Sequence, residues 1–124
     1  MLNNEQAFFL QILSDYVAVR TSQFSSSIHW NTIVTYAEKH ELSGIFYNQC
    51  KQFIPAEQLM SLERKNAAEH FYYANNLKEY ARISAILKRN SIKFALFKGL
   101  KIANVYPLSY NRTMGDFDFL VDAS

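Results

Sequence analysis

The sequence predicts an α+β protein, with a mostly helical region over residues 1–90 and the first strands of a small mixed sheet over residues 91–124. Three observations predict this fold. Apolar residues recur at helical spacing through the first three quarters of the chain, where Gly44 and Pro55 are the only glycine and proline. The last third instead holds two short apolar runs of strand length. The chain has 124 residues, 49% of them hydrophobic and 15% aromatic, so it can bury a modest core as one domain or a fragment of one.

The first half of the chain is expected to be helical. Asn3 or Asn4 can accept hydrogen bonds from the free N–H groups at the start of the first helix. After a serine-rich break, a second helix begins around Trp30 and ends near His40. Residues 42–44 form either a turn or the closely packed start of another helix. The apolar face of the first helix comprises Phe8, Phe9, Ile12, Leu13, Tyr16 and Val17.

A long helix is predicted to follow Pro55. Proline suits the first turn of a helix, because the N–H group that it lacks would be unpaired there. Neither glycine nor proline occurs again before residue 90. A run of this length is unusual for one globular helix, so we expect a kink or break at residues 74–76. The residues that fit one face are Leu59, Leu62, Ala67, Phe71, Ala74, Leu77, Ala81, Ser84 and Leu87.

Two strands are predicted near residues 92–97 and 116–121, where apolar side chains are dense. We expect these strands to pair. A two-stranded sheet is marginal by itself, so helices, a partner chain or further sequence must cover it. The residues expected to be buried against the helices are Phe94, Leu96, Phe117 and Phe119.

The segment between the strands begins with Lys98-Gly99, which is expected to end the first strand. Residues 100–106 have the spacing of a brief helix, and Pro107 stops it. Such a helix offers free N–H groups and the positive end of its dipole to an anion beside Gly99. Residues 109–114 are expected to form a loop.

Two carboxylates lie one residue apart in the second predicted strand. Alternate side chains of a strand face the same side, so Asp116 and Asp118 point one way while Phe117 and Phe119 point the other. On a helix the two acids would diverge by roughly 200°. Strand geometry therefore makes a two-pronged carboxylate group, which suits one or two Mg²⁺ ions because Mg²⁺ prefers oxygen ligands.

The charge pattern favours an anionic substrate. The net charge of +2 is too small to indicate nucleic-acid binding, and no recognition motif supports it. Residues 78–101, however, hold seven basic residues and one acid, Glu79. A local positive field just before two aspartates suits an anion that carries a metal ion. The alternative is an ordinary solvated helix face.

Several classes of protein and site are excluded or disfavoured. A single cysteine, Cys50, excludes an intramolecular disulfide and a paired-cysteine metal site, and we expect it to be a small residue of the core or its boundary. The N-terminus lacks signal-peptide features and no apolar run reaches about 18 residues, so we expect a cytoplasmic protein with no membrane span. The three histidines, His29, His40 and His70, are expected to serve packing or the surface rather than to act as bases.

The end of the chain resembles a known family. "LFKG", Tyr106-Pro107, Arg112 and "GDFDFLV" occur in the order found in the DNA-polymerase-β-like nucleotidyltransferase superfamily. More narrowly, they resemble its uncharacterised nucleotidyltransferase family, over roughly residues 94–121. An isolated Asp-x-Asp is a weak signal, whereas the ordered strand, glycine turn, helix, arginine and acidic strand are more specific.

The resemblance implies a function and a site. Asp116 and Asp118 match the metal-binding catalytic carboxylates, which hold two Mg²⁺ ions in the complete superfamily site. Lys98, Gly99 and Arg112 match positions expected to bind the phosphates of a nucleoside triphosphate. The implied reaction transfers a nucleoside monophosphate from the triphosphate to an acceptor, which the sequence does not identify.

Two departures from the superfamily pattern matter. The residue after Gly99 is Leu100, where a serine commonly contacts phosphate. A third carboxylate normally follows on a later strand, and only Asp122, four residues after Asp118, could substitute for it here. We therefore expect the 124 residues to be the N-terminal part of a longer protein and to be inactive alone.

Other interpretations stay open. Asp116 and Asp118 could simply face water on an edge strand, Lys98-Gly99 could be a plain turn, and Arg112 could be a surface or ion-pairing residue. The chain would then be a non-catalytic helical protein-interaction module with a degenerate nucleotidyltransferase site. An exposed sheet edge would also favour a homodimer.

Overall fold

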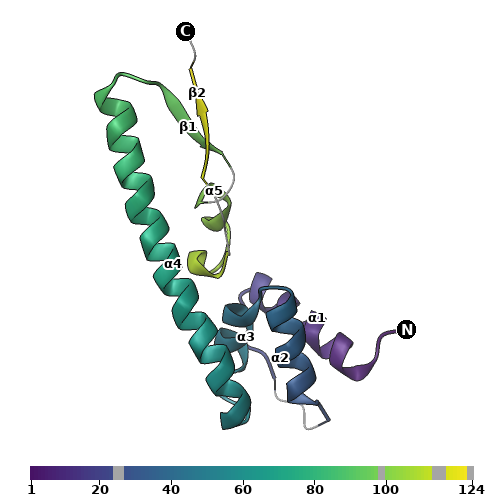
Figure 1. The fold of residues 1–124 in the computed structure, drawn as a ribbon. Coiled ribbons are helices and arrows are strands. Elements are labelled where there is room, and N and C mark those ends of the chain that lie inside the picture. The colour runs from purple at the N-terminus through teal and green to yellow at the C-terminus, as the bar shows by residue number, and fades with distance from the viewer. Residues whose placement is uncertain (24–26, 98–99, 113–116, 123–124) are drawn as a thin grey trace. The chain divides into compact units, whose positions relative to one another are not determined.

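The computed structural model describes residues 1–23, 27–97, 100–112 and 117–122, which form two compact units, Met1–Ala68 and Glu69–Ser124. The α+β fold is confirmed, since helices dominate and the two described strands form one sheet near the C-terminus (Figure 1). The elements are α1 (Asn4–Val17), α2 (Trp30–Lys39), α3 (Ser43–Cys50), α4 (Ala56–Arg89), β1 (Phe94–Phe97), α5 (Leu100–Ala103), the 3-10 helix η1 (Ser109–Asn111) and β2 (Asp118–Val121).

The start of α1 is capped as the sequence predicts. The Asn3 side-chain oxygen accepts a hydrogen bond from the Gln6 backbone N–H at 2.8 Å, and the Gln6 side-chain oxygen accepts one from the Asn3 backbone N–H at 3.0 Å. Two N–H groups that would otherwise lack intrahelical partners are thereby satisfied, a stabilisation of about 1 kcal/mol.

Three helices end in the same unusual way. The chain turns through a left-handed residue at Val19, Glu41 and Ser91, with φ between 54° and 58°. Glycine fits this conformation at the lowest cost, yet none of the three residues is glycine. In each case a backbone N–H closes the last turn, with bonds of 2.7 Å from Arg20 to Asp15, 2.7 Å from Leu42 to Ala37 and 2.9 Å from Ile92 to Leu87.

Helices α1, α2, α3 and the first turns of α4 enclose the core of the first unit. The Phe9 ring stacks on the Phe46 ring with centroids 4.6 Å apart and meets the Tyr36 ring edge-on. Cys50 is buried, as predicted, and burial raises the pKa of its thiol to about 12. Val17, by contrast, is exposed, so its predicted place on the apolar face of the first helix is wrong. The largest fully buried side chains are Phe46, Ile12, Ile33, Leu62 and Cys50.

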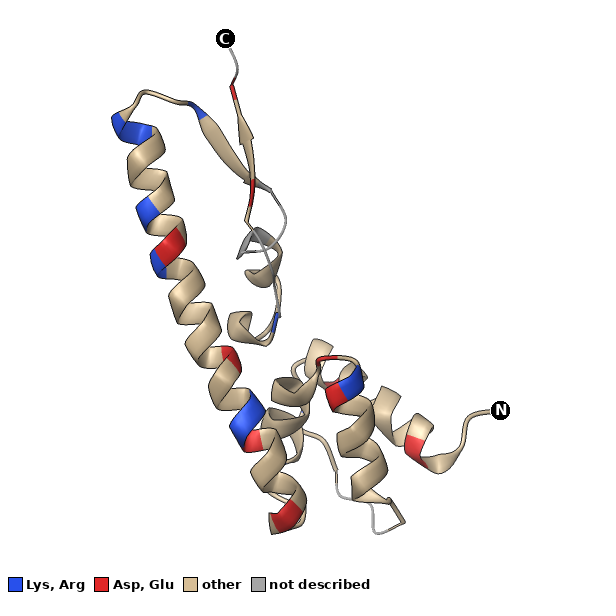
Figure 2. Ribbon diagram, viewed as in Figure 1, with Lys and Arg blue, Asp and Glu red and all other residues tan. Residues whose placement is uncertain are grey.

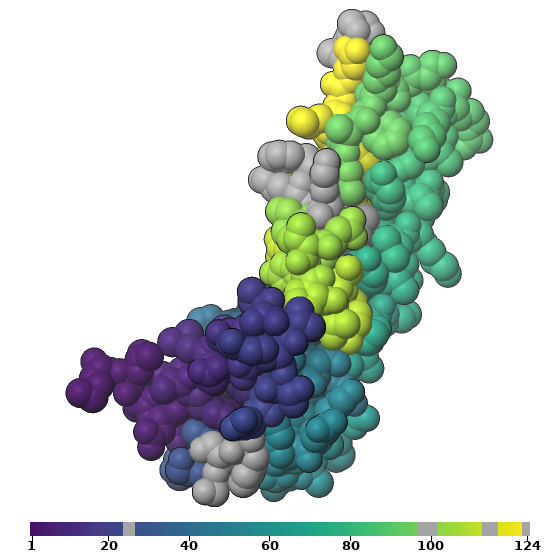
Figure 3. All heavy atoms as spheres, turned by 180° about the vertical axis from the view of Figure 1, so that it is seen from behind, coloured from purple at the N-terminus to yellow at the C-terminus, as the bar shows by residue number. Residues whose placement is uncertain are grey.

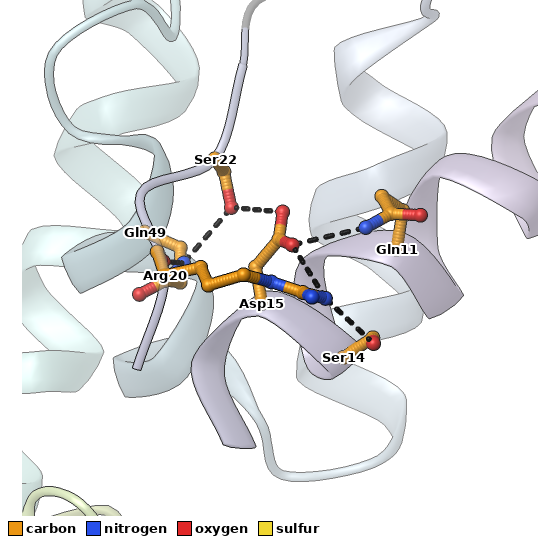
Figure 4. Close-up of polar contacts among 6 residues, drawn as sticks. All are labelled: Gln11, Ser14, Asp15, Arg20, Ser22 and Gln49. Carbon is orange, nitrogen blue, oxygen red and sulfur yellow. Dashed lines mark hydrogen bonds and ion pairs between the residues drawn. The ribbon is translucent and has the colours of Figure 1, made fainter. Parts of the chain in front are cut away.

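A carboxylate also lies inside the first unit (Figure 4). Asp15 is only 7% exposed and accepts hydrogen bonds from Gln11 at 2.9 Å and from Ser22 at 3.0 Å, while an Arg20 guanidinium nitrogen lies 3.3 Å from it. The Gln49 amide of α3 in turn donates to the Ser22 hydroxyl at 2.8 Å. Burial acts to raise the pKa of Asp15, but these hydrogen bonds and the Arg20 charge outweigh it and lower the pKa below its ordinary value. The network ties the segment after α1 to α3.

Helix α4 is continuous over 34 residues, so the break expected at residues 74–76 is wrong. The alanine and asparagines there carry no backbone restriction comparable to that of proline. The predicted apolar face is also partly wrong, because Phe71 and Leu77 are exposed. One series of its buried and half-buried residues follows spacings of three and four: Leu62, Asn66, Glu69, Tyr73, Asn76, Tyr80, Ser84 and Leu87.

The predicted strands exist and pair antiparallel in the second unit. Each is shorter than expected, since β1 begins at Phe94 and β2 at Asp118. Phe119 stacks on Tyr80 of α4 at 6.1 Å and meets Phe94 edge-on at 5.8 Å. The predicted burial is only partly confirmed. The four residues expected to be buried are half-buried: Phe94, Leu96, Phe117 and Phe119.

The segment between the strands differs from expectation in two places. Helix α5 ends at Ala103, earlier than predicted, and Ala103 is completely buried. Residues 109–111 form η1 rather than a loop, because the Asn111 N–H donates to the Leu108 carbonyl at 3.0 Å and the Arg112 N–H to the Ser109 carbonyl at 3.2 Å. Among the described helices, none combines the length and apolar character required for a membrane span.

Candidate functional site

Asp118 begins β2 and is exposed. It lies opposite Phe97, the last residue of β1. Directly opposed residues of an antiparallel pair project to the same side, and neighbours along a strand alternate. Phe119 contacts Tyr80 of α4, so Asp118 projects from the other face of the sheet. Its carboxylate is therefore available to solvent and to a ligand.

The strand register bears on the rest of the predicted site. Because Phe97 is opposite Asp118, the chain leaves β1 beside the carboxylate that begins β2. The next two residues, Lys98 and Gly99, lie outside the described residues, and so does Asp116. The predicted carboxylate pair and glycine turn thus stay predictions. What the structure gives is the register of the strands, with Phe97 opposite Asp118.

Arg112 directly follows η1 and is half-buried with an extended backbone, at φ −81° and ψ 104°. Contacts to α4 hold the two residues before it. The Asn111 side-chain amide, in a residue only 2% exposed, donates to a Glu69 carboxylate oxygen at 3.2 Å. The Tyr110 ring stacks on the His70 ring with centroids 3.5 Å apart and planes 28° apart. Figure 3 shows η1 lying against α4.

We call these four residues, Glu69, His70, Tyr110 and Asn111, the η1 clasp. Sequence analysis did not single out three of them, and it assigned His70 to packing or the surface, which agrees with its exposed but stacked ring. A sequence signal did exist for Glu69. It lies three residues after Asn66 and four before Tyr73, within the three-and-four spacing of the covered side of α4.

Positive charge gathers on the C-terminal half of α4 (Figure 2). Glu79 engages Arg82, whose Nε donates to both of its carboxylate oxygens at 3.0 and 3.2 Å. The hydrogen bonds from Arg82 lower the pKa of Glu79, and the Glu79 carboxylate raises the pKa of Arg82. Further basic residues of this half are Lys78, Lys88 and Arg89.

The described residues offer little of a metal site by themselves. Across residues 1–23, 27–97, 100–112 and 117–122, no three side chains of histidine, cysteine, aspartate or glutamate gather closely enough to hold a metal ion. Asp118 has the hard oxygen ligands that Mg²⁺ prefers, and its exposure leaves room for waters and phosphate oxygens. The donor type therefore fits Mg²⁺, while the predicted second ligand, Asp116, lies outside the described part of the chain.

Two open grooves occur away from Asp118. One, of about 460 Å³, lies between α4 and β1, where Tyr80 and Phe94 line it together with Asn104. The other, of about 580 Å³, lies in the first unit, where Asp15, Arg20 and Phe8 contribute to its wall. Neither groove includes a residue of the predicted phosphate and metal site.

Comparisons with known proteins gave one positive finding. A family model described as "Uncharacterised nucleotidyltransferase" matches residues 26–124, which include α2 to β2 and exclude α1. Searches of curated proteins and of solved structures returned no match.

Proposed function

Because the chain belongs to the uncharacterised nucleotidyltransferase family, we propose that it carries part of the active site of a Mg²⁺-dependent nucleotidyltransferase. The substrate would be a nucleoside triphosphate. The second substrate is an acceptor with a hydroxyl or phosphate oxygen. Asp116 and Asp118 would hold the metal ions, while Lys98, Gly99 and Arg112 would bind phosphate.

The proposed reaction is one displacement at the α-phosphorus. An acceptor oxygen forms a bond to that phosphorus, and the bond from the phosphorus to the bridging oxygen of the β-phosphate breaks. The electron pair of that bond leaves with pyrophosphate; a hydroxyl acceptor also gives its proton to a base, whereas a phosphate oxygen is already ionised. Two Mg²⁺ ions, when bound, offset charge on the attacking and leaving oxygens.

The strand register is the observation that supports this proposal most directly. It pairs Phe97, the last residue of β1, with the solvent-facing Asp118, and Lys98 and Gly99 are the next two residues of the sequence. A nucleotidyltransferase needs its metal-binding carboxylates close to its phosphate-binding turn, since the metal ions contact the phosphates that the turn binds.

The residues of the site would have distinct tasks. The carboxylates of Asp116 and Asp118 orient the metal-bound triphosphate. Glycine has no side chain, so the backbone at Gly99 would allow the phosphates to approach closely. Lys98 and Arg112 would offset the phosphate charge, and Arg112 has the planar guanidinium that suits bidentate binding.

The alternative function is a helical protein-interaction module. It is favoured by two adjacent aromatic residues on α4, Phe71 and Tyr72, which are 63% and 64% exposed. Exposed aromatic side chains are common at protein interfaces. In that case the Asp-x-Asp strand would have no role in binding nucleotides.

Calorimetric titration of triphosphates in the presence of Mg²⁺ separates the two functions. The longest natural chain that contains these residues is compared with its Asp116→Ala/Asp118→Ala variant. We expect the wild type to bind a triphosphate and the double variant to lose at least about 10-fold in affinity, because each carboxylate makes charge-assisted contacts to the metal. Glu63→Gln is a control for net charge, because it removes one exposed negative charge from α4, half the change made by the double variant.

The outcomes distinguish the proposals clearly. Affinity that is equal in the wild type and the double variant would contradict the nucleotidyltransferase site and favour the interaction module. Loss of affinity in Glu63→Gln as well would mean that net charge, and not the Asp-x-Asp pair, controls binding.

We also propose that the protein is a cytoplasmic homodimer. Within the described chain the sheet has two strands, so each strand has one edge without a neighbouring strand. Open edges favour pairing with another chain. Light scattering coupled to gel filtration measures the mass, and a monomer at tens of micromolar would contradict the dimer.

A further inference from the structure

The η1 clasp lies directly before Arg112, and the proposed function gives it no task. We propose that Asn111 and Tyr110 are positioning residues that set Arg112 for binding the triphosphate, with Glu69 and His70 of α4 as their anchors. This inference rests on the proposed function. It adds that α4 controls phosphate binding through η1, although neither Glu69 nor His70 belongs to the predicted site.

The first support is the burial of the asparagine. Asn111 is among the least exposed polar residues described, at 2%, and its amide reaches the Glu69 carboxylate at 3.2 Å. A buried amide must be hydrogen-bonded, so its partner strongly restricts its position. Glu69 lies on a continuous helix of 34 residues, so the backbone that carries the acceptor is held in a regular conformation.

The second support is the ring stack. Tyr110 and His70 have centroids 3.5 Å apart and a 28° angle between their planes, so the rings lie nearly face to face. Tyr110 and Asn111 are neighbours in η1, and His70 and Glu69 are neighbours in α4. The two contacts therefore join the same two short segments and fix both the distance and the rotation of η1.

The third support is the short path from the clasp to the site. The Arg112 backbone N–H donates to the Ser109 carbonyl at 3.2 Å, so its backbone starts from the last turn of η1. A 3-10 helix of three residues has little stability of its own. Without the clasp, the starting point of the Arg112 side chain would vary, and small displacements of a binding group have large effects on phosphate contacts.

A double-mutant cycle tests this proposal, with the Mg²⁺–ATP dissociation constant as the readout in the longest natural chain. The four proteins are the wild type, Asn111→Ala, Arg112→Ala and the double variant. We expect Asn111→Ala to weaken ATP binding about 5- to 10-fold in the wild type, and less than about 2-fold when Arg112 is already alanine. Weakening by the same factor in both backgrounds would overturn the positioning role, as would no weakening in the wild type.

Conservative variants guard against a folding defect. Glu69→Ala removes the acceptor while leaving η1 intact in sequence, and Glu69→Gln keeps a side-chain oxygen that can accept the bond. We expect Glu69→Ala to weaken ATP binding and Glu69→Gln to restore most of it. Tyr110→Phe should bind as the wild type does, because the ring is retained, whereas Tyr110→Ala should not. Equal binding by each conservative variant and its alanine counterpart would contradict the proposal.

A matched control separates positioning from lost stability. Asn66→Ala also removes a nearly buried asparagine of α4, one that accepts a hydrogen bond from Asn48 in the first unit. It should lower the melting temperature without changing ATP affinity. If Asp116→Ala/Asp118→Ala loses affinity but Asn111→Ala does not, only the positioning proposal fails. If the wild type itself binds no triphosphate, both proposals fail.

Discussion

Ten of the eleven buried apolar residues in the described chain belong to the first unit, Met1–Ala68, and the second unit contributes only Ala103. The aromatic contacts of the two units differ in the same way. In the Phe9–Phe46 stack the Phe46 ring is completely buried, whereas both rings of the Tyr80–Phe119 stack are half-buried. The units also share one helix, since α4 extends from the first into the second.

This difference in burial separates the unit that supplies most of the stability from the unit that contains the predicted site. Burial of apolar area is the dominant favourable contribution to folding, so the first unit supplies most of it. The second unit contains the predicted phosphate and metal site, which needs solvent-facing carboxylates and cannot be covered in the same way.

The largest expected effect compares one phenylalanine from each unit. Phe46→Ala should lower the free energy of unfolding by about 3–5 kcal/mol, since it leaves a cavity at a site with no solvent exposure. Phe119→Ala should cost less than about half as much, because its ring is already half-exposed. Urea unfolding followed by circular dichroism measures both. Equal losses would mean that the sheet is as well packed as the helical core.

The next largest effect concerns the buried carboxylate of the first unit. Asp15→Asn should lower the free energy of unfolding at pH 7 by about 2 kcal/mol, because it removes a charge that Gln11, Ser22 and Arg20 satisfy. The pKa of Asp15 in the folded protein is below its ordinary value of 3.8. Its contribution is therefore complete well above pH 3.8 and disappears as the pH falls through the lower folded value.

Acid unfolding provides the check on this carboxylate. The difference in stability between the wild type and Asp15→Asn should be constant from pH 7 to about pH 5 and should shrink below pH 3.8. Glu57→Gln, which removes the charge of an exposed acid on α4, is the control for the loss of one carboxylate. A difference that grows on acidification would contradict the assignment of Asp15 as a stabilising anion.

Local signals explain what the sequence could predict. The Asn3 cap, the start of α2 at Trp30 and its end at His40 depend on neighbouring residues only, and all three are confirmed. The strands were placed within two residues at their starts, since short apolar runs carry that information. Asp118 lies in a strand as its alternation predicts, although its metal-binding role is untested.

Tertiary packing explains what the sequence could not predict. The covered side of α4 carries Asn66, Glu69 and Tyr73, so counting apolar residues selected a face that leaves Phe71 exposed. The burial of Asn111 likewise depends on a contact with Glu69, 42 residues earlier in the chain. The three-and-four spacing on α4 includes polar residues, which a count of apolar residues passes over, and the burial of Asn111 has no periodic signal in its own segment. Polar residues that satisfy one another across such distances are visible only in the folded chain.

A smaller effect compares the left-handed helix ends of the two units. Val19→Gly should raise the free energy of unfolding by about 1 kcal/mol, because a β-branched residue at φ 54° is strained and its side chain is 80% exposed. Ser91→Gly, at φ 57° in the second unit, should raise the free energy of unfolding by less, because serine is not β-branched and is less strained at positive φ. Thermal unfolding ranks the two variants, and a larger gain at Ser91 would contradict this explanation.

The smallest expected effect tests how well the second unit satisfies its buried polar groups. Ser84 on α4 is 7% exposed, and within the described chain its hydroxyl oxygen has no hydrogen-bond partner, in contrast with the hydrogen-bonded network around Asp15. A buried hydroxyl without a partner is destabilising, and alanine is the better helix former. Ser84→Ala should therefore raise the free energy of unfolding by about 0.5–1 kcal/mol, measured by urea unfolding, whereas Ser22→Ala in the first unit should lower it. A loss of stability in Ser84→Ala would show that the hydroxyl has a partner and that the second unit is more completely paired than its sparse core suggests.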